Sequence, residues 1–279
     1  MIRKNTQSVL KIGEHQKISA VIITYNEMGY IEHCIASVGF ADEIIVVDSY
    51  SSDGTYEYLS AHPKIKVIQH PFQDFTKQKT FALKQASNDW VLFLDADEVV
   101  PAGLRKEIIA VTNRPSPHVA YWFYRKFMFK NAHLRFSGWQ TDKNYRLFRK
   151  SKVAFCQERR VHERLEVEGT SGVLNKRLLH YSYKKYEDYK EKMLRYGQLK
   201  ALQCHENGKQ VLPLKLMAAP IWKFLYNYTI RLGMLDGRKG IIICYLNALS
   251  DLERYREFRQ LNRKSTELHD TAVLSPVRE

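Results

Sequence analysis

Trp90–Glu98 reads WVLFLDADE, a run of five apolar residues that ends in a cluster of three carboxylates. A short, continuous apolar run of this kind is typical of a strand buried on both faces, as in a parallel sheet. In open α/β sheets, ligands bind beyond the carboxyl ends of the strands. The stretch therefore predicts both the class of the fold and the place of a site.

Three further apolar runs precede this one and alternate with helical patterns, the first opening with Asn26 as a candidate N-cap. The expected strands are Ile18–Thr24 (ISAVIIT), Glu43–Asp48 (EIIVVD) and Ile65–Gln69, and the expected helices are Glu27–Val38, Tyr56–His62 and Asp74–Ser87. Such alternation predicts an α/β fold, Rossmann-like, with a mostly parallel sheet and helices on both faces.

The remainder of the chain changes character. A helix is expected from Pro101 to Thr112, an aromatic strand over Ala120–Phe129, and mixed strands and loops over residues 134–182. From Tyr186 onward the pattern is helical, with breaks near residues 207–208 and 236–237. We therefore expect a C-terminal helical extension after the sheet.

Charge is distributed unevenly along the chain, whose formal net charge is +14. Residues 1–110 hold 11 Lys and Arg against 14 Asp and Glu, whereas residues 111–279 hold 33 against 16. A basic excess of this size points to an anionic partner such as lipid headgroups, phosphorylated glycans or nucleic acid. No nucleic-acid-binding signature accompanies it, so a nucleic-acid partner is not expected.

Cysteine spacing and hydropathy indicate the compartment. The four cysteines form no zinc-ligand pattern, and we expect reduced, mostly buried thiols, as in a cytosolic protein. The N-terminus lacks the apolar core of a signal peptide, and no apolar run reaches the roughly 18–20 residues that span a bilayer. The expected location is the cytoplasm, in contact with the inner face of the cytoplasmic membrane but without crossing it.

Asp95 and Asp97 form a DxD pattern just past the predicted fourth strand. Two carboxylates at this spacing can share one divalent cation, Mg²⁺ or Mn²⁺, with a diphosphate, because these ions prefer hard oxygen ligands. The pair alone is also common in solvated turns and helix caps. Its place after a buried strand favours the metal site.

Three segments in this order and spacing resemble the family 2 glycosyltransferases, which are inverting enzymes of the GT-A fold: VIITYNE (Val21–Glu27), EIIVVDSYSSDGT (Glu43–Thr55) and WVLFLDADE. Three later segments are similar to the bacterial lipopolysaccharide-core β-1,4-glucosyltransferase branch, namely Gly138–Lys150, Arg159–Gly169 and Leu235–Gly240. The resemblance implies metal-dependent transfer of a hexose, with UDP-glucose the favoured donor, to a saccharide or lipid-linked acceptor.

Two other enzyme activities are alternatives to this one. A polyprenyl-phosphate or other cell-surface polysaccharide glycosyltransferase would share the donor half and differ only in its acceptor. A nucleotidyltransferase usually carries a Gly-rich basic loop after the first strand, where this chain has TYNEMGYIE.

The resemblance also implies a division of the chain. Residues 1–17 are a lead-in, 18–182 the GT-A domain, 183–265 a basic amphipathic helical region and 266–279 a tail. Within the GT-A domain, residues 18–112 form the donor half and residues 113–182 the acceptor half.

Residues of the donor half match positions that hold the nucleotide sugar in the family. Those expected to bind it are Thr24, Tyr25, Glu27, Asp48, Asp53, Lys79 and Asp95. Asp48 matches the residue that contacts uracil or ribose, although many relatives have adjacent acids where this chain has Asp48-Ser49. Asp53 could instead cap the following helix. Lys79 is expected to face the diphosphate, and Lys77 is the alternative for this role. If neither lysine binds the donor, both lie on a solvated helix face.

Single-displacement inversion needs a general base near the acceptor hydroxyl. Glu163, within RRVHERL, is the first candidate and Asp142 the second, and a surface ion pair of Glu163 with a neighbouring arginine is the structural alternative. His162 is expected to complete the metal shell, with Asp95 and Asp97, or to touch the pyrophosphate.

Three residues are expected to bind the acceptor: Trp139, Arg146 and Arg149. Alternatively, Trp139 packs in the core and the two arginines lie on a solvated strand face. In the C-terminal region, large apolar residues from Leu214 to Tyr228 recur at helical spacing, and Lys215, Lys223 and Arg231 interleave with them. This pattern fits peripheral contact with an anionic membrane, or equally a helix packed on the domain with a basic outer face.

Overall fold

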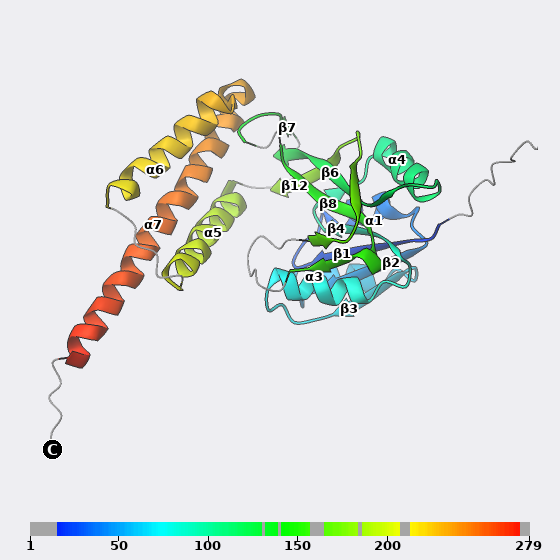
Figure 1. Ribbon diagram of the computed structural model, residues 1–279, viewed down its shortest axis with the longest axis horizontal. Helices are drawn as coiled ribbons and strands as arrows, with labels where there is room; N and C mark the ends of the chain where they lie inside the picture. The colour runs from blue at the N-terminus through cyan, green and yellow to red at the C-terminus, as the bar shows by residue number, and fades with distance from the viewer. Residues whose placement is uncertain are drawn as a thin grey trace, which may run out of the picture. The chain divides into compact units, whose positions relative to one another are not determined.

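The computed structural model describes residues 16–129, 132–138, 141–156, 165–183, 186–206 and 213–273. The first part alternates strands and helices, as Figure 1 shows. Its elements are β1 (Ile18–Thr24), α1 (Ile31–Val38), β2 (Glu43–Asp48), α2 (Thr55–Ser60), β3 (Ile65–Gln69), α3 (Phe75–Lys84), β4 (Trp90–Asp95), β5 (Glu98–Val99) and α4 (Ala102–Thr112).

Four parallel strands lie side by side at one end of the sheet in the order β3-β2-β1-β4. The register pairs Thr24 with Asp48 across β1 and β2, and Ile23 with Asp95 across β1 and β4. The carboxyl ends of β1, β2 and β4 are thereby brought to one edge of the sheet. The predicted mostly parallel α/β sheet is confirmed.

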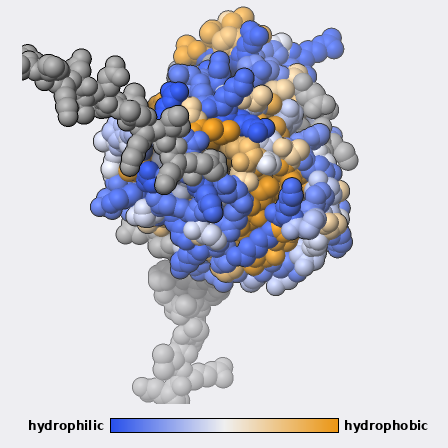
Figure 2. Space-filling view, turned by 90° about the vertical axis from the view of Figure 1, so that its right-hand side faces the viewer, coloured by the Kyte–Doolittle hydropathy of each residue, from blue (hydrophilic) through white to orange (hydrophobic). Residues whose placement is uncertain are grey.

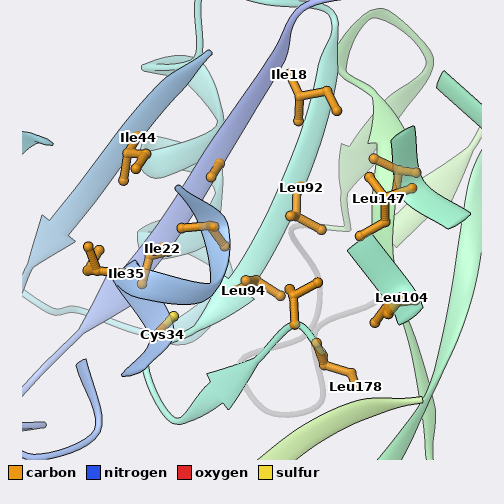
Figure 3. Packing of buried hydrophobic residues seen from close by; sticks show 14 of the residues in the cluster. Ile18, Ile22, Cys34, Ile35, Ile44, Leu92, Leu94, Leu104, Leu147 and Leu178 are labelled. Atoms are coloured by element: carbon orange, nitrogen blue, oxygen red, sulfur yellow. The ribbon is translucent and has the colours of Figure 1, made fainter. Parts of the chain in front are cut away.

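Two apolar layers hold this sheet, because β-strand side chains alternate between its faces. One layer includes Ile22, Leu92 and Leu94 with Cys34 of α1 and Leu104 of α4, part of which is drawn in Figure 3. On the other face, alternate residues of the same strands pack with α3. These layers fix β4 from both sides, which explains why its sequence is continuously apolar.

The first helix begins later than the sequence predicted. Asn26 does not cap it: Asn26 has φ +54°, its side chain accepts a hydrogen bond from the N–H of Ser52, and the N-cap is Tyr30. The Asn26 side chain therefore joins the loops after β1 and β2 and does not cap α1. In contrast, α3 starts as expected, with Asp74 accepting a hydrogen bond from the N–H of Lys77.

The second part of the sheet joins the first through the antiparallel strand β8. β8 (Lys143–Arg149) pairs with β4 and with β6 (His118–Phe129), both antiparallel. The other elements are β7 (Ala132–Leu134), η1 (Lys150–Lys152), β9 (Val153–Phe155), β10 (Leu165–Val167), β11 (Thr170–Val173) and β12 (Leu178–Tyr183). β12 pairs with β5, which places His180 opposite Glu98.

The chain divides into two compact units, Met1–Arg125 with Lys143–His180, and Lys126–Asp142 with Tyr181–Glu279. The second unit thus includes residues 126–142, which the sequence assigned to the acceptor half. Its helical elements are α5 (Tyr186–Glu206), α6 (Pro213–Leu225), the π-helical turn η2 (Tyr226–Ile230), the 3₁₀ turn η3 (Gly233–Asp236) and α7 (Gly237–Val273). The predicted C-terminal helical extension is confirmed. A break lies at residues 236–237, where η3 ends and α7 begins, and the break expected near residues 207–208 lies outside the described residues.

Within the second unit, α5 and α6 both pack on α7. The apolar centre joins Phe127, Phe129 and Leu134 to residues of α5 and α7. At Gly197 of α5, a Cβ atom would lie 2.6 Å from the carbonyl oxygen of Ser250, so the close contact with α7 requires glycine there.

On the face that Figure 2 shows, hydrophilic residues predominate and hydrophobic ones gather in limited areas. Among the described helices, none combines the length and the apolar character needed to cross a bilayer.

Asp236 holds the segment that follows β7. Its carboxylate accepts hydrogen bonds from the N–H groups of Arg135 and Phe136, both at 2.9 Å, and from the Ser137 hydroxyl at 2.9 Å. Hydrogen bonds to a charged acceptor stabilise by roughly 1.5–3 kcal/mol each. The LDGRKG segment therefore has a structural role in the second unit.

Asp236→Ala should lower the free energy of unfolding by about 2–4 kcal/mol, because it leaves three donors without their acceptor. Urea unfolding followed by circular dichroism measures the change. Glu191→Ala, an exposed acid of α5, is the matched control and should stay within about 0.5 kcal/mol of the parent chain. Equal effects of the two substitutions would contradict the role of Asp236.

Candidate functional site

Asp95, the last residue of β4, lies between two basic side chains. Arg146 Nη2 donates a hydrogen bond to Asp95 Oδ2 at 2.5 Å, and Lys79 Nζ lies 3.5 Å from Asp95 Oδ1. Arg146 comes from β8, which pairs with β4, and Lys79 comes from α3, which packs on the same sheet. Both cations are almost fully buried, whereas the Asp95 side chain keeps 29% of its surface exposed. Asp95 is therefore the carboxylate of this cluster that a ligand can reach.

Glu98 supports this arrangement from beneath. It is fully buried, and its Oε1 accepts hydrogen bonds from Arg146 Nη2 at 2.7 Å and from Arg125 Nη1 at 3.3 Å. Its Oε2 accepts the N–H of Asp95 at 3.1 Å. Glu98 thereby fixes both the turn after β4 and the guanidinium group that contacts Asp95.

Asp97 points to a different partner. Its Oδ2 lies 3.2 Å from His180 Nε2, and both side chains are mostly buried. His180 reaches this position because β12 pairs with β5 in antiparallel register. The two acids of the DxD pattern are thus held by different parts of the sheet.

Opposite charges meet in this cluster. The carboxylates of Asp95 and Glu98 face three permanent cations, Lys79, Arg125 and Arg146. Burial acts to raise the pKa of Asp95, but the nearby Arg146 and then Lys79 outweigh it and hold that pKa well below its usual range. Conversely, Asp95 and Glu98 raise the pKa of Arg146 against the effect of burial. Asp95 is accordingly ionised at any physiological pH.

Asp48 ends β2 next to Thr24, two strands from Asp95, or about 10 Å by ordinary strand spacing. It is fully buried, and it accepts hydrogen bonds from the Ser51 N–H at 3.0 Å, the Ser51 hydroxyl at 2.5 Å and Gln69 Nε2 at 3.3 Å. Beside it, the buried hydroxyl of Thr24 has no hydrogen-bond partner among the described residues. Asp48 therefore shapes the loop, and Thr24 offers a polar group at the strand end.

Hydrogen bonds join the loops after β1 and β2. Met28 N–H donates to Asp53 Oδ2 at 3.0 Å, and Glu27 N–H donates to Thr55 Oγ1 at 3.0 Å. Asp53 also accepts from the N–H and the hydroxyl of Thr55, at 3.1 and 2.6 Å, and so stabilises the start of α2, although the N-cap is Gly54 and not Asp53 as the capping alternative predicted. Burial acts to raise the pKa of Asp53, but these hydrogen bonds from Thr55 and Met28 lower it overall.

Two aromatic side chains are exposed on these loops. Tyr25 and Tyr50 follow the ends of β1 and β2, and more than half of each side chain is exposed. Tyr50 has φ +61°, a conformation uncommon for a residue with a side chain, and it escaped the sequence analysis because no pattern marks an exposed loop tyrosine. Flat exposed rings beside a polar strand end offer stacking surfaces.

The structure brings together several of the residues expected in the donor site. Thr24, Asp48, Lys79 and Asp95 lie at one edge of the sheet. Of the two lysines considered, Lys79 contacts Asp95, whereas Lys77 is exposed and lies 4.0 Å from Asp74.

The three residues expected to bind the acceptor are separated. Arg146 is buried against Asp95 and Glu98. Arg149 pairs with Trp90 in the β4–β8 register, so it lies at the opposite end of β4 from Asp95, where it contacts Asp89 at 3.0 Å and the Trp90 ring at 4.6 Å. This position does not bring Arg149 to the donor edge. Trp139 lies outside the described residues, as do Glu163 and His162.

Asp142 belongs to the second unit and is half-buried. The sequence analysis missed three buried members of the charged cluster: Glu98, Arg125 and His180. The DADE run does contain Glu98, and the apolar surroundings of His180 in LLHYSY could have indicated a buried histidine. Arg125 carries no such signal, because its partner is set by strand pairing.

A divalent cation is compatible with the residues at this edge. The partly exposed, ionised carboxylate of Asp95 is a suitable oxygen ligand, with Asp97 two residues away. Mg²⁺ and Mn²⁺ sites that share substrate phosphates need only one or two protein carboxylates. Among the residues that the structure describes, no group of three or more His, Cys, Asp and Glu side chains is arranged to hold a metal by itself. An ion here would thus depend on phosphate oxygens.

Comparison with known proteins agrees with this geometry. The sequence profile of glycosyl transferase family 2 matches residues 19–159. A lipopolysaccharide core biosynthesis glycosyltransferase of Rhizobium meliloti, LpsC, is 30% identical over 85% of this chain and 93% of its own length. An uncharacterized glycosyltransferase of Rickettsia typhi is 30% identical over 90% of this chain and 89% of its own.

Among solved structures, residues 1–349 of S. aureus TarS match at a TM-score of 0.45 with 19% sequence identity, over 87% of this chain and 92% of that one.

Replacing Arg146 with Met should lower the free energy of unfolding by about 3–5 kcal/mol near neutral pH, since it leaves two carboxylates without their shared cation. Asp95 has a lowered pKa in the folded chain, so its contribution to stability is present above about pH 4 and is lost as pH falls toward the folded pKa. The difference between parent and variant should therefore narrow below about pH 4. Urea unfolding at several pH values measures it.

Arg149→Met is the matched control, because that arginine forms a half-exposed pair with Asp89. Its effect should be about 1 kcal/mol or less. If the two arginine variants lost similar stability, or if the Arg146→Met deficit did not change with pH, the account of the buried cluster would be wrong.

Proposed function

The chain belongs to glycosyl transferase family 2, and from this premise we propose that it transfers a hexose from a UDP-sugar, with UDP-glucose the favoured donor, to a saccharide or lipid-linked acceptor of the lipopolysaccharide core. The similarity to LpsC along nearly the whole of both chains supports the lipopolysaccharide assignment over the polyprenyl-phosphate alternative. Family membership sets aside the nucleic-acid-binding and nucleotidyltransferase readings.

The observation that carries the donor assignment is the pairing of two features at one sheet edge. The ends of β1 and β2 supply the hydroxyl of Thr24 and the exposed ring of Tyr25, which suit a nucleoside, beside a loop that the buried Asp48 holds in place. The end of β4 supplies Asp95 beside Lys79 and Arg146, which suit a diphosphate and its counterion. The separation of about 10 Å between Asp48 and Asp95 suits a nucleoside diphosphate lying across the strand ends.

Asp95 and Asp97 are the residues that would hold a divalent ion, with His162 as a further candidate. Such an ion, when bound, offsets the charge that builds up on the departing diphosphate. Lys79 and Arg146 contact the Asp95 carboxylate and hold its orientation without help from a ligand. Lys79, which the donor phosphates can also attract, adds positive charge at the same place.

Transfer with inversion requires that the acceptor hydroxyl attack the anomeric carbon while the bond to the diphosphate oxygen breaks. The proton of that hydroxyl passes to a carboxylate, for which we propose Glu163 first and Asp142 second. Trp139 is retained as the acceptor-stacking residue. Arg146 and Arg149 are not, because their side chains are engaged with carboxylates of the sheet.

We also propose that the enzyme works at the cytoplasmic face of the membrane, where a lipid-linked acceptor would be available. The basic excess after residue 110 supports this location.

A screen of nucleotide sugars with Mn²⁺ or Mg²⁺, read as nucleoside diphosphate release, should single out a UDP-hexose, and EDTA should abolish turnover. Asp97→Ala should reduce release at least a hundred-fold and weaken Mn²⁺ binding in the presence of UDP, measured by electron paramagnetic resonance. Asp89→Ala, at the opposite end of β4, is the control and should bind Mn²⁺ and UDP as the parent does. Unchanged turnover or Mn²⁺ binding in Asp97→Ala would refute the metal assignment.

Glu163→Gln should bind UDP-sugar with unchanged affinity, by calorimetry, and lose at least a hundred-fold in turnover, since the amide cannot accept the proton. Asp142→Asn is the companion variant. Loss of turnover in Asp142→Asn alone would transfer the role of base to Asp142.

A further inference from the structure

The second unit exposes large apolar side chains in one continuous stretch of the chain. Ten of them lie between α6 and the first turns of α7: Ile221, Trp222, Leu225, Tyr226, Ile230, Leu232, Met234, Leu235, Ile241 and Tyr245. Four of these, Ile221, Trp222, Ile230 and Leu235, have more than 60% of their surface exposed. We call this set the apolar tip. Soluble proteins seldom expose so many large apolar residues in one segment unless the segment meets a partner.

The charge of the same segment is one-sided. Lys223 and Arg238 are exposed on it, and Arg231 and Lys239 are partly exposed. The only acid between residues 213 and 250 is Asp236, and its carboxylate already accepts three hydrogen bonds from the segment after β7. Within residues 213–250, the chain therefore supplies basic side chains to the apolar tip and no acid other than Asp236.

We propose that the apolar tip inserts into the interface of an anionic lipid bilayer. Apolar residues that carry Trp and Tyr among them suit the boundary between headgroups and acyl chains, and Lys and Arg at their margin attract acidic headgroups. A protein partner of matching shape would more often meet a surface with charges of both signs. The composition of the tip thus favours a lipid surface, and the inference is independent of the sugar-transfer chemistry.

The full-length chain should bind vesicles of phosphatidylcholine with phosphatidylglycerol in a flotation assay and bind phosphatidylcholine alone much more weakly. Salt should weaken the binding, because it screens the basic residues. Trp222 emission should shift to the blue on binding, and Trp222→Phe should remove most of that shift, since Trp222 is the tryptophan of the apolar tip and is 66% exposed.

Variants of the tip test the assignment. Replacing Ile221, Trp222, Ile230 and Leu235 with Ser should weaken vesicle binding at least ten-fold, because these side chains are the most exposed. Leu202→Ser with Leu252→Ser, two exposed leucines of α5 and α7 outside the tip, is the matched control and should bind as the parent does. Lys223→Glu with Arg238→Glu should remove the preference for phosphatidylglycerol, whereas Arg256→Glu with Arg259→Glu should not.

Circular dichroism and UDP binding verify that each variant is folded, and they keep this test separate from the test of sugar transfer. Absence of binding by the parent chain, or equal binding by the tip variant and its control, would overturn the proposal. A concentration-dependent dimer seen by light scattering, lost in the tip variant and unaffected by vesicles, would assign the surface to a second copy of the chain instead.

Discussion

The candidate site depends on a buried set of opposite charges at the end of β4. An isolated carboxylate in the position of Glu98, fully buried, would be strongly destabilising, so Arg125 and Arg146 must accompany it. The same Arg146 extends to Asp95, which is partly exposed. Arg146 therefore both neutralises the buried Glu98 and orients the partly exposed carboxylate of Asp95.

This arrangement explains why residues distant in sequence behave as one group. Asp95 and Glu98 belong to one turn, Lys79 to the preceding helix, and Arg125 and Arg146 to strands that pair antiparallel later in the chain. A cation that met Asp95 would compete with Lys79 and Arg146 for its oxygens. The doubly negative diphosphate of a donor would relieve that competition by attracting the same cations, so ion and donor are expected to favour each other's binding.

Particular elements show which parts of the fold and of the site could be predicted from the sequence. The strands Ile18–Thr24, Glu43–Asp48 and Ile65–Gln69 were predicted with the observed bounds, because a strand buried on both faces has a composition that few other elements share. The start of α1 was missed because the hydrogen bonds of Asn26 go to the neighbouring loop, and a cap and a loop bridge use the same residue type. Arg146 was predicted to bind a ligand, and its ion pairs with Asp95 and Glu98 follow from the β4–β8 register, which no local pattern encodes.

The motif RLFRK (Arg146–Lys150) is recognisable in the sequence, but the contacts of its side chains are structural. Leu147 and Phe148 pack in the two opposite core layers, and Arg146 neutralises the buried acids. Lys150 donates a hydrogen bond to the carbonyl oxygen of Ala86 at 2.7 Å, which ties β8 to the loop before β4. Every one of these contacts positions β4. The motif therefore acts on the site through the strand that carries Asp95, and its basic residues need not touch a substrate to matter for the reaction.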